Sequence, residues 1–481
     1  MSIETKKTEV KESGKVKKLG WWDTIRFHVT VTIVSFLCGF VAPIRLFVPV
    51  LVKLNAAQWR VRTLDALREK HKCDLFWVPL LGLVVLDGHN IDTLLTSTQT
   101  QADPPLKKGT LSNFIPESLT ISNEKDWPGR RKFNQRVLDS GEPHRYRDAF
   151  VEIVSAEVAR IPARAAPGEL RWVDFQVLAE RISQQVLLGS GELNPELETQ
   201  LERLVARSNF LVPWKGSSFS AFYRNIERYL SRQRAAIDNP SREQPSHGTP
   251  ASVRCLMHDS AEQLANGTAT AATRVPTQIG FWMFVLKDAL ELHVARTLAL
   301  IAAHPQVEHR VRRDLQGNSK MTAEKVHGLQ YLDACLREQL RLWTPVPMLL
   351  RRATETFSLH GEIPIAAGRQ ILMYPGYYHR DPCVFGHIAD QFSPDSVSER
   401  LPPIYYFSTG RQACAGASLA LFMVKATLAS LLARFRFELI GPRVDPDRIP
   451  YLYDHFHVKF RAILEGSSES RDALGTATAR Q

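Results

Sequence analysis

The sequence predicts a mainly α fold with small β-sheets. Between residues 145 and 235, apolar residues recur at helical spacing in successive segments that end at prolines and glycines. Two further apolar helical patterns follow, one over about 277–303 and one after Gly416. Short alternating runs at 75–86 and 357–374 are typical of strands. With 44% hydrophobic and 23% charged residues, the 481-residue chain can bury a large core.

The net charge and the cysteines indicate which partners and which compartment the protein has. The formal charge of +11 indicates attraction to anionic surfaces or to acidic protein partners. We expect no nucleic-acid partner, because the chain has no zinc-ligand spacing, RNA-binding signature or basic helix interleaved with aromatics. The six cysteines are scattered without a C-x-x-C pair, which favours reduced thiols and a cytosol-facing location.

The first residues predict an arm followed by an apolar segment. Residues 1–20 are polar and rich in lysine, so we expect a solvated arm there. Residues 21–54 begin with paired tryptophans and include an uncharged run, Phe27–Ile44, close to the roughly twenty residues that cross a bilayer. Flanking lysines and tryptophans favour membrane attachment, and a buried helix of the soluble fold is the alternative. Because a true span would place the arm and the rest of the chain on opposite sides, an interfacial or re-entrant anchor is preferred.

The elements up to residue 137 are predicted from turn and helix-start signals. Leu75–Leu86 reads as a β-hairpin, and a short helix follows over Asn90–Leu95. A later helix starts at Trp127, where Pro128 suits the first turn. Trp127 and Arg131 are four residues apart, so they share one face of that helix.

The second half of the chain predicts a loop, two helices and short strands. Residues 238–252 form the clearest flexible loop, and the central helix runs from about Thr277 to Ala303, because the residue before a proline avoids helical geometry. A helix over 330–343 carries Glu338 and Arg341 as neighbours on one face, a pair that is worth little when it is solvated.

The most specific stretch is a loop that presents one cysteine where a helix begins. It reads Phe407-Ser-Thr-Gly410-Arg-Gln412-Ala-Cys414-Ala-Gly416. The unpaired N–H groups at a helix start and its dipole favour a thiolate, the form that binds metals. Gly410 permits a tight turn, and Gly416 lets a flat ligand lie close to the backbone. The alternative is an inert buried cysteine.

This ten-residue pattern resembles the cysteine loop of the cytochrome P450 family, F-x-x-G-x-[R/H]-x-C-x-G. The resemblance implies one large helical catalytic domain over residues 55–465, built around a buried haem b, and a disordered tail over 466–481. It implies that the Cys414 thiolate is the metal ligand to the haem iron. It departs at Gln412, where the family has an Arg or His that contacts a haem propionate.

The same resemblance assigns further cofactor-binding residues. Phe407, Gly410 and Gly416 are expected haem contacts in the loop.

Trp127 and Arg131 match a W-x-x-x-R helix that binds one propionate, and a solvated basic helix with a packed tryptophan is the alternative. Arg351 matches a strand arginine that binds a propionate, with Arg352 close behind. Arginine suits this role because its planar fork pairs well with a carboxylate.

The central helix carries the expected catalytic acid. Counting back from the helix-ending proline, Val285–Ala289 fall on the family's A-G-x-[D/E]-T, with Asp288 as the acid and Ala289 in place of the threonine. Proton delivery must then use water, substrate or another side chain, or the enzyme uses peroxide. Asp288 as a mere partner of Lys287 is the alternative. A different register, with Arg274, faintly resembles the arginine of fatty-acid peroxygenases.

Glu338 and Arg341 match the family's E-x-x-R pair, whose role is structural. Ser396 stands where the family has a meander arginine that joins this pair, and Arg400 is our candidate replacement.

The resemblance implies a monooxygenase that inserts one oxygen atom from O2 into a small apolar substrate. No flavin or nicotinamide fingerprint occurs, so electrons must come from a separate reductase or ferredoxin. Basic segments around Arg131 and Arg411 are candidate docking charges for that partner. We expect a monomer, membrane-associated with its catalytic domain facing the cytosol, or else cytoplasmic. A peroxide-using or peroxide-isomerising enzyme and a non-enzymatic haem carrier or sensor are the alternatives.

Overall fold

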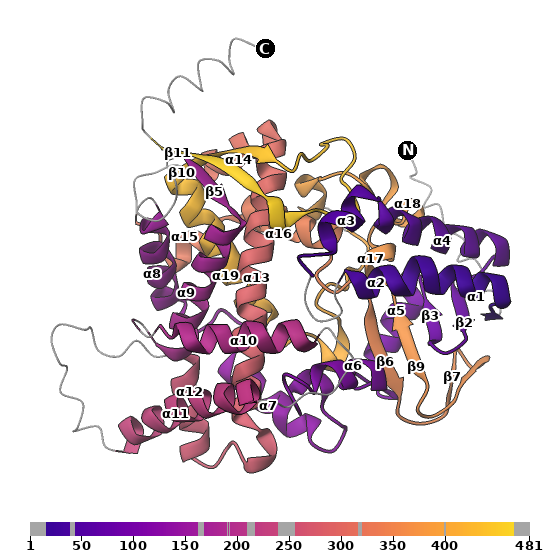
Figure 1. The fold of residues 1–481 in the computed structure, drawn as a ribbon, viewed down its shortest axis with the longest axis horizontal. Helices are drawn as coiled ribbons and strands as arrows, with labels where there is room; N and C mark the ends of the chain where they lie inside the picture. The colour runs from indigo at the N-terminus through magenta and orange to yellow at the C-terminus, as the bar shows by residue number, and fades with distance from the viewer. Residues whose placement is uncertain are drawn as a thin grey trace, which may run out of the picture.

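The computed structural model describes residues 16–38, 44–161, 168–189, 191, 193–208, 217–238, 255–315, 320–398 and 401–465. A helical part and a part that contains the main sheet lie side by side (Figure 1). The mainly α prediction is confirmed. The larger helices of the helical part are α7 (Trp127–Val137), α8 (Arg147–Ala159), α9 (Trp172–Leu188), α10 (Pro195–Ser208), α11 (Ser217–Asp238), α12 (Leu256–Ala265), α13 (Val275–Ala303), α14 (Pro305–Leu315), α16 (Gln330–Leu342) and α19 (Ala417–Arg434).

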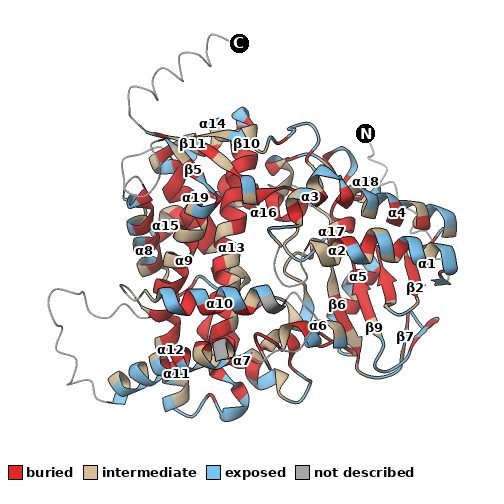
Figure 2. Cartoon of the chain, in the orientation of Figure 1, coloured by how far each residue is buried: buried red, intermediate tan, exposed pale blue. Residues whose placement is uncertain are grey.

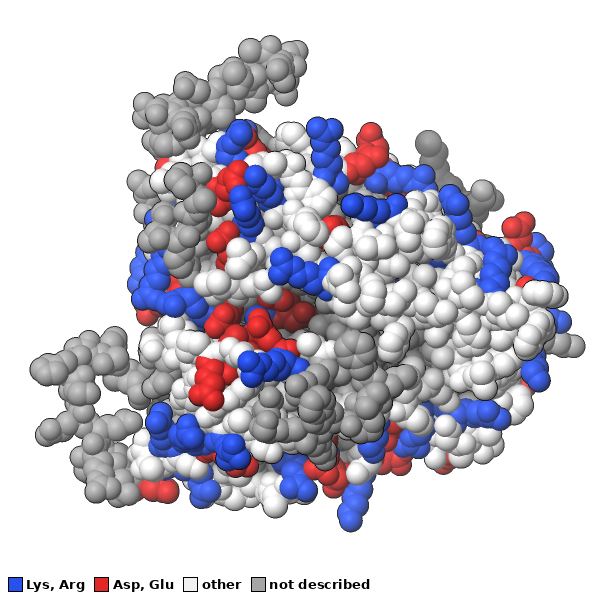
Figure 3. All heavy atoms as spheres, viewed as in Figure 1, with Lys and Arg blue, Asp and Glu red and all other residues white. Residues whose placement is uncertain are grey.

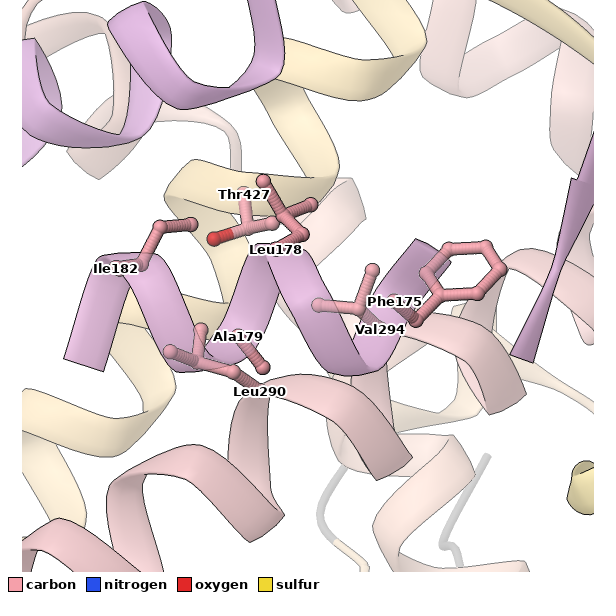
Figure 4. Close-up of a pocket in the computed structure, with 7 residues that line it drawn as sticks. All are labelled: Phe175, Leu178, Ala179, Ile182, Leu290, Val294 and Thr427. Atoms are coloured by element: carbon pink, nitrogen blue, oxygen red, sulfur yellow. The ribbon is translucent and has the colours of Figure 1, made fainter. Parts of the chain in front are cut away.

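The central helix α13 is the axis of the helical part. It starts two residues before the predicted position and ends at Ala303 as expected. Apolar side chains of α9 and α13 meet Thr427 of α19 along one of its faces, and they pack so closely that no space for a water molecule remains between them (Figure 4). Figure 2 shows buried residues concentrated along α9, α13 and α19. This packing fixes α13, and with it the direction of its remaining faces.

Three sheets occur within the described ranges. The largest has the strand order β1-β2-β3-β9-β6-β4, the second β10-β11-β5, and the third pairs β7 with β8. The predicted hairpin is confirmed as β2 and β3, which pair antiparallel from Leu75↔Val85 to Val78↔Gly82. The strand bounds are β1 (Lys17–Lys18), β2 (Leu75–Val78), β3 (Gly82–Val85), β4 (Thr100–Gln101), β5 (Glu169–Arg171), β6 (Leu349–Ala353), β7 (Phe357–Leu359), β8 (Ile363–Ile365), β9 (Gln370–Met373), β10 (Phe435–Gly441) and β11 (Lys459–Leu464).

The apolar segment predicted over 21–54 packs against the fold. Its helices are α1 (Trp21–Phe27), the π-helical η1 (His28–Ile33), α2 (Val34–Leu37) and α3 (Val48–Lys53), all packed on α4 (Ala56–His71). Of the arm predicted over 1–20, the structure describes residues 16–20, where the exposed Lys17 and Lys18 pair in parallel with β2. Among the described helices, α19 is the one long and apolar enough to cross a bilayer, and 61% of it is buried in the core.

Some predictions fall outside the described residues. These are most of the arm, the loop over 238–252, the tail from 466 and the proposed meander residue Arg400. All six cysteines are described, and each is a free thiol, as expected for a reduced protein.

Candidate functional site

The cysteine loop is held by its own backbone and by α5 (Gly88–Thr96). The Cys414 N–H donates to the Phe407 carbonyl at 2.9 Å, which closes the loop before α19 begins. Gly410 has φ +66°, and a Cβ there would lie 2.8 Å from the Leu95 carbonyl oxygen. Both the dihedral and the close approach require glycine, as the sequence indicated. Gly416 has an ordinary φ of −97°, so its role as a close ligand contact stays a prediction.

The Cys414 thiol is solvent-accessible although protein atoms surround it, the environment of a side chain at the floor of a concave site. Burial raises its pKa, while the Gly416 N–H and the Arg131 guanidinium act in the opposite direction. The surrounding donors therefore favour the thiolate, but burial outweighs them. A bound cation would reverse the balance, because a coordinating thiol is deprotonated outright.

Helix α7 supplies two of the predicted residues beside this loop. It begins at Trp127, as predicted. Arg131, one turn later, donates from Nη1 to the Ala413 carbonyl, and its buried Nε has no partner among the described residues. The Arg411 guanidinium lies 5.3 Å from the centre of the Trp127 ring. Arg131 and Arg411 thus make contacts within this site, and docking of an electron donor on the basic segments around them stays a prediction.

Arg351 contacts the loop at Ser408 and lies near a lysine, Lys107, that sequence reasoning missed. Arg351 is 3% exposed, donates from Nη2 to Ser408 Oγ at 2.9 Å, and keeps an unpartnered Nε. Burial and Arg411 lower the pKa of Arg351 to about 10. Lys107, on α6 (Pro105–Leu111), donates to the Thr120 carbonyl and hydroxyl, and burial together with Arg351 lowers its pKa to about 7. Asp103, which opposes that shift, is paired with Arg352.

Gln412 does not take over the role of the cation it replaces. Its amide nitrogen donates to Gln101 Oε1 at 2.6 Å and to the Thr100 carbonyl. Arg411 Nη2 donates to the same two groups and to the Thr98 carbonyl. Gln412 therefore ties the loop to β4.

Asp288 lines a cavity of about 350 Å³ between α10 and α13. Burial raises the pKa of Asp288 to about 6, with Arg296 and Lys287 opposing the shift. Glu291, one turn later, lines the same cavity, and burial raises its pKa to about 8. Lys287 pairs with Glu198 and Glu202 on α10, so the interpretation of Asp288 as a simple partner of Lys287 is not supported.

The cavity has aromatic as well as acidic walls. Phe284, Trp172 and Phe456 line it beside the carboxyl groups. In the space-filling view, acidic atoms gather in a hollow near the centre of this face (Figure 3). Arg274, the alternative catalytic residue, is paired instead with Glu117 before α13 begins.

The E-x-x-R pair is fully buried, as expected. Both side chains are 0% exposed, and Arg341 Nη2 and Nε bind the two Glu338 carboxylate oxygens at 2.7 and 2.8 Å. Arg341 also donates to the carbonyls of His379, Ile388, Ala389 and Gln391. The Ser393 N–H donates to Glu338 at 3.1 Å, so backbone groups complete the pair where the family has an arginine side chain.

The predicted residues therefore form two groups. Cys414, Arg131 and Trp127 are joined through the loop, and Arg351 reaches the same loop at Ser408. Asp288 lies on a separate wall, with Glu291. The i, i+3 spacing could have indicated Glu291, but no spacing in the sequence singles out Lys107.

Comparison with known proteins adds an independent observation. The family model described as Cytochrome P450 matches residues 293–452, a range that contains Glu338, Arg351 and Cys414. Cytochrome P450 72A397 of Kalopanax septemlobus is 27% identical, over 76% of each chain. Cytochrome P450 4c3 of Drosophila melanogaster is 30% identical over 37% of this chain and 35% of that protein. Cytochrome P450 monooxygenase 91 of Postia placenta is 30% identical over 37% of this chain and 40% of that one.

The family model and these relatives all identify the cytochrome P450 family as the one that this chain resembles. The mainly α fold with small sheets is consistent with that family. The matched segments span less than half of the fly and fungal relatives and about three quarters of the plant relative.

The residues around the cysteine loop fit a haem. Arg411 belongs to the cysteine loop, Arg131 and Arg351 hydrogen-bond to it, and Lys107 lies near Arg351. Each of the three arginines has a buried Nε without a partner among the described residues. Arg351 lies close enough to Arg411 and Lys107 for each pair to repel. Buried like charges are stable only when an anion compensates them. The two propionates of a haem whose iron binds Cys414 are carboxylates of the required charge.

Proposed function

We propose that this chain is a haem-thiolate monooxygenase, which inserts one oxygen atom from O2 into a small apolar substrate with electrons from a separate reductase or ferredoxin. The observation that carries the proposal is one accessible thiol at a helix start, in a loop that the buried Arg351 and the partly buried Arg131 both contact. The relatives named cytochrome P450 support it.

The residues of the site would have distinct roles in binding the haem. Cys414 would hold the iron of haem b, while Trp127, Arg131 and Arg351 would hold its propionates, with Phe407, Gly410 and Gly416 against the macrocycle. When bound, the haem supplies the redox chemistry with O2, and a thiolate ligand favours O–O cleavage. The protein's part is to bind, orient and move protons.

Asp288 and Glu291 are the side chains that would accept and release protons. With pKa values near 6 and 8, Asp288 is mostly ionised at neutral pH and Glu291 mostly protonated. A carboxyl pair of this kind can accept and release protons beside Ala289, where a hydroxyl is missing. The aromatic walls suit an apolar substrate.

The experiment is a reduced carbon monoxide difference spectrum of the wild type and of Cys414→Ala. We expect a thiolate-type Soret shift in the wild type and its loss in the variant. A shift that persists in Cys414→Ala contradicts the ligand assignment.

Ala289 favours a second candidate, a peroxide-using or peroxide-isomerising enzyme on the same haem. An enzyme that turns over substrate with peroxide, but not with O2 and any reductase, would support this second candidate. If the protein is instead a haem carrier or sensor, we expect that no apolar compound changes the spin state of its haem.

We also propose that the protein acts at a membrane surface, with its catalytic domain in the cytosol and as a monomer. The support is the apolar segment over 21–54 and the net charge of +11.

A further inference from the structure

Exposed apolar side chains are concentrated in one short part of the chain. Of the fourteen large hydrophobic side chains that are exposed in the described residues, nine lie between residues 21 and 59. We call eight of them the apolar face: Trp21, Trp22, Ile25, Val29, Ile33, Leu46, Val50 and Leu54. Trp22 is 78% exposed and Leu46 is 72% exposed. Scattered single residues are normal on a surface, but this concentration is not.

The opposite side of the same helices is fixed to the fold. Phe27 and Val31 are 0% exposed and pack in a cluster with Leu64 and Leu67 of α4. Thr30 Oγ1 donates to Thr63 Oγ1 at 2.8 Å. These contacts hold the helical run along α4, half buried and half exposed.

Both ends of the first helix are tied down as well. Asp23 pairs with Lys70 at 2.8 Å and with His71 at 3.0 Å. His28 Nε2 is 3.2 Å from the Pro79 carbonyl oxygen. To cross a bilayer, the helix would have to break all of these contacts, so the structure favours a helix that lies along the surface.

The charges beside the apolar face are of one sign. Between residues 16 and 60 the single acid is Asp23, which is turned to Lys70 and His71. Arg26, Arg45 and Lys53 are exposed, and no carboxylate of the described residues forms an ion pair with them. Figure 3 shows a broad uncharged surface over α1–α3 with basic atoms at its margin. Apolar side chains flanked by basic ones suit anionic lipid headgroups.

We propose that the apolar face is an in-plane anchor that inserts into the headgroup layer of a bilayer containing anionic phospholipid. This inference rests on the membrane part of the proposed function and specifies its surface. The cavity that holds Asp288 is also lined by Ile44 and Arg45, which directly precede Leu46 of the apolar face. The anchor therefore sets the cavity wall against the lipid, where an apolar substrate is concentrated.

The test is flotation of the haem-loaded protein with phosphatidylcholine vesicles, with and without phosphatidylserine. The variant Val29→Glu/Ile33→Glu changes the apolar face. The matched control, Val346→Glu/Ile440→Glu, changes two similarly exposed residues elsewhere. We expect the wild type and the control to float with the anionic vesicles, and the face variant to bind at least tenfold more weakly, since two charges replace inserted apolar groups. The carbon monoxide spectrum checks that each variant keeps its fold.

The outcomes separate the two levels of the proposal. Equal flotation of the face variant and the wild type overturns the assigned face but leaves membrane association intact. A wild type that never floats refutes membrane association itself. Resistance to alkaline carbonate extraction would indicate a span and contradict an in-plane anchor. A wild-type dimer that the face variant makes monomeric, without any effect on flotation, would show that the face binds a second copy.

Discussion

Lys107 lies in an environment that disfavours the charged form of a lysine. Its ammonium donates to two oxygens of Thr120, and burial together with the nearby Arg351 lowers its pKa to about 7. Gln412 is neutral and bonded to Gln101, so a positive charge is missing from its usual place in the cysteine loop. We predict that Lys107, which lies near Arg351, supplies a cation from another element.

Lys107→Gln should have opposite effects on the haem-loaded and haem-free protein. Haem transfer to apomyoglobin should be about tenfold faster, because a charge-assisted hydrogen bond is worth roughly 1.5–3 kcal/mol. Haem-free wild type should gain stability as the pH rises from about 7 toward 10.5, because the unfolded state then binds more protons, and the variant should lose this dependence. Lys108→Gln, at the exposed neighbour, is the control. Equal destabilisation of both forms would reduce Lys107 to a structural tie for Thr120.

Glu291 should make the protein less stable as the pH rises. Its folded-state pKa of about 8 lies above the ordinary value of 4.5, so between these values the folded state binds more protons and unfolding becomes easier as pH increases. Glu291→Gln should remove a pH-dependent loss on the order of 2 kcal/mol. Denaturant unfolding at a series of pH values measures this loss. Lys287, Asp288, Glu198 and Glu202 all act electrostatically on the Glu291 carboxyl, so the comparison is with Glu227→Gln, on the exposed face of α11.

At the scale of elements, helix α16 is fixed by one arginine. Arg341 uses its donors on Glu338 and on four carbonyls of the segment 379–391, and all of these contacts except the one to Gln391 are fully buried. Lysine cannot reproduce this planar fork.

Arg341→Lys should lower the free energy of unfolding by about 3–5 kcal/mol, because it leaves a buried carboxylate and several carbonyls without donors. Arg337→Lys, one turn earlier on the same helix, should change it by less than about 1 kcal/mol, since its pair with Asp333 is partly exposed. Denaturant unfolding compares the two variants. Similar losses in both would contradict the structural role given to the buried pair.

The cysteine loop, which packs on α5 and directly precedes α19, depends on a glycine. Gly410→Ala places a Cβ 2.8 Å from the Leu95 carbonyl oxygen and 2.9 Å from Thr96 Cα, in a residue with φ +66°. We expect reduced haem content and a stability loss above about 2 kcal/mol. Gly368→Ala shares the positive φ but meets no atom within 4 Å, so it should lose only about 1 kcal/mol. A smaller effect at Gly410 than at Gly368 would contradict the close packing of the loop on α5.

At the scale of the whole molecule, local patterns predicted much of the fold. The periodicity of α13, the start of α7 at Trp127 and the hairpin of β2 and β3 depend on neighbours in sequence, and all three are confirmed. Most assignments of the site came from the cysteine-loop resemblance. The contacts of Lys107 with Thr120 and Arg351, and of Gln412 with Gln101, depend on tertiary structure, which no spacing encodes.

The first helices show a different limit. Hydropathy measures how apolar a segment is, but it cannot tell lipid from protein as the apolar surroundings. Phe27 and Val31 face the fold while Val29 and Ile33 face outward, and the alternation becomes meaningful only once α4 is placed beside them.

That packing bears on how the protein is prepared. Truncation upstream of a catalytic body is the routine way to obtain a soluble form of an anchored enzyme. Here, deleting residues 1–44 would strip Phe27 and Val31 from Leu64 and Leu67 and leave the underlying sheet layer bare. A shortened product should aggregate, whereas exchanging the outward side chains for polar ones should yield a soluble enzyme with its core intact.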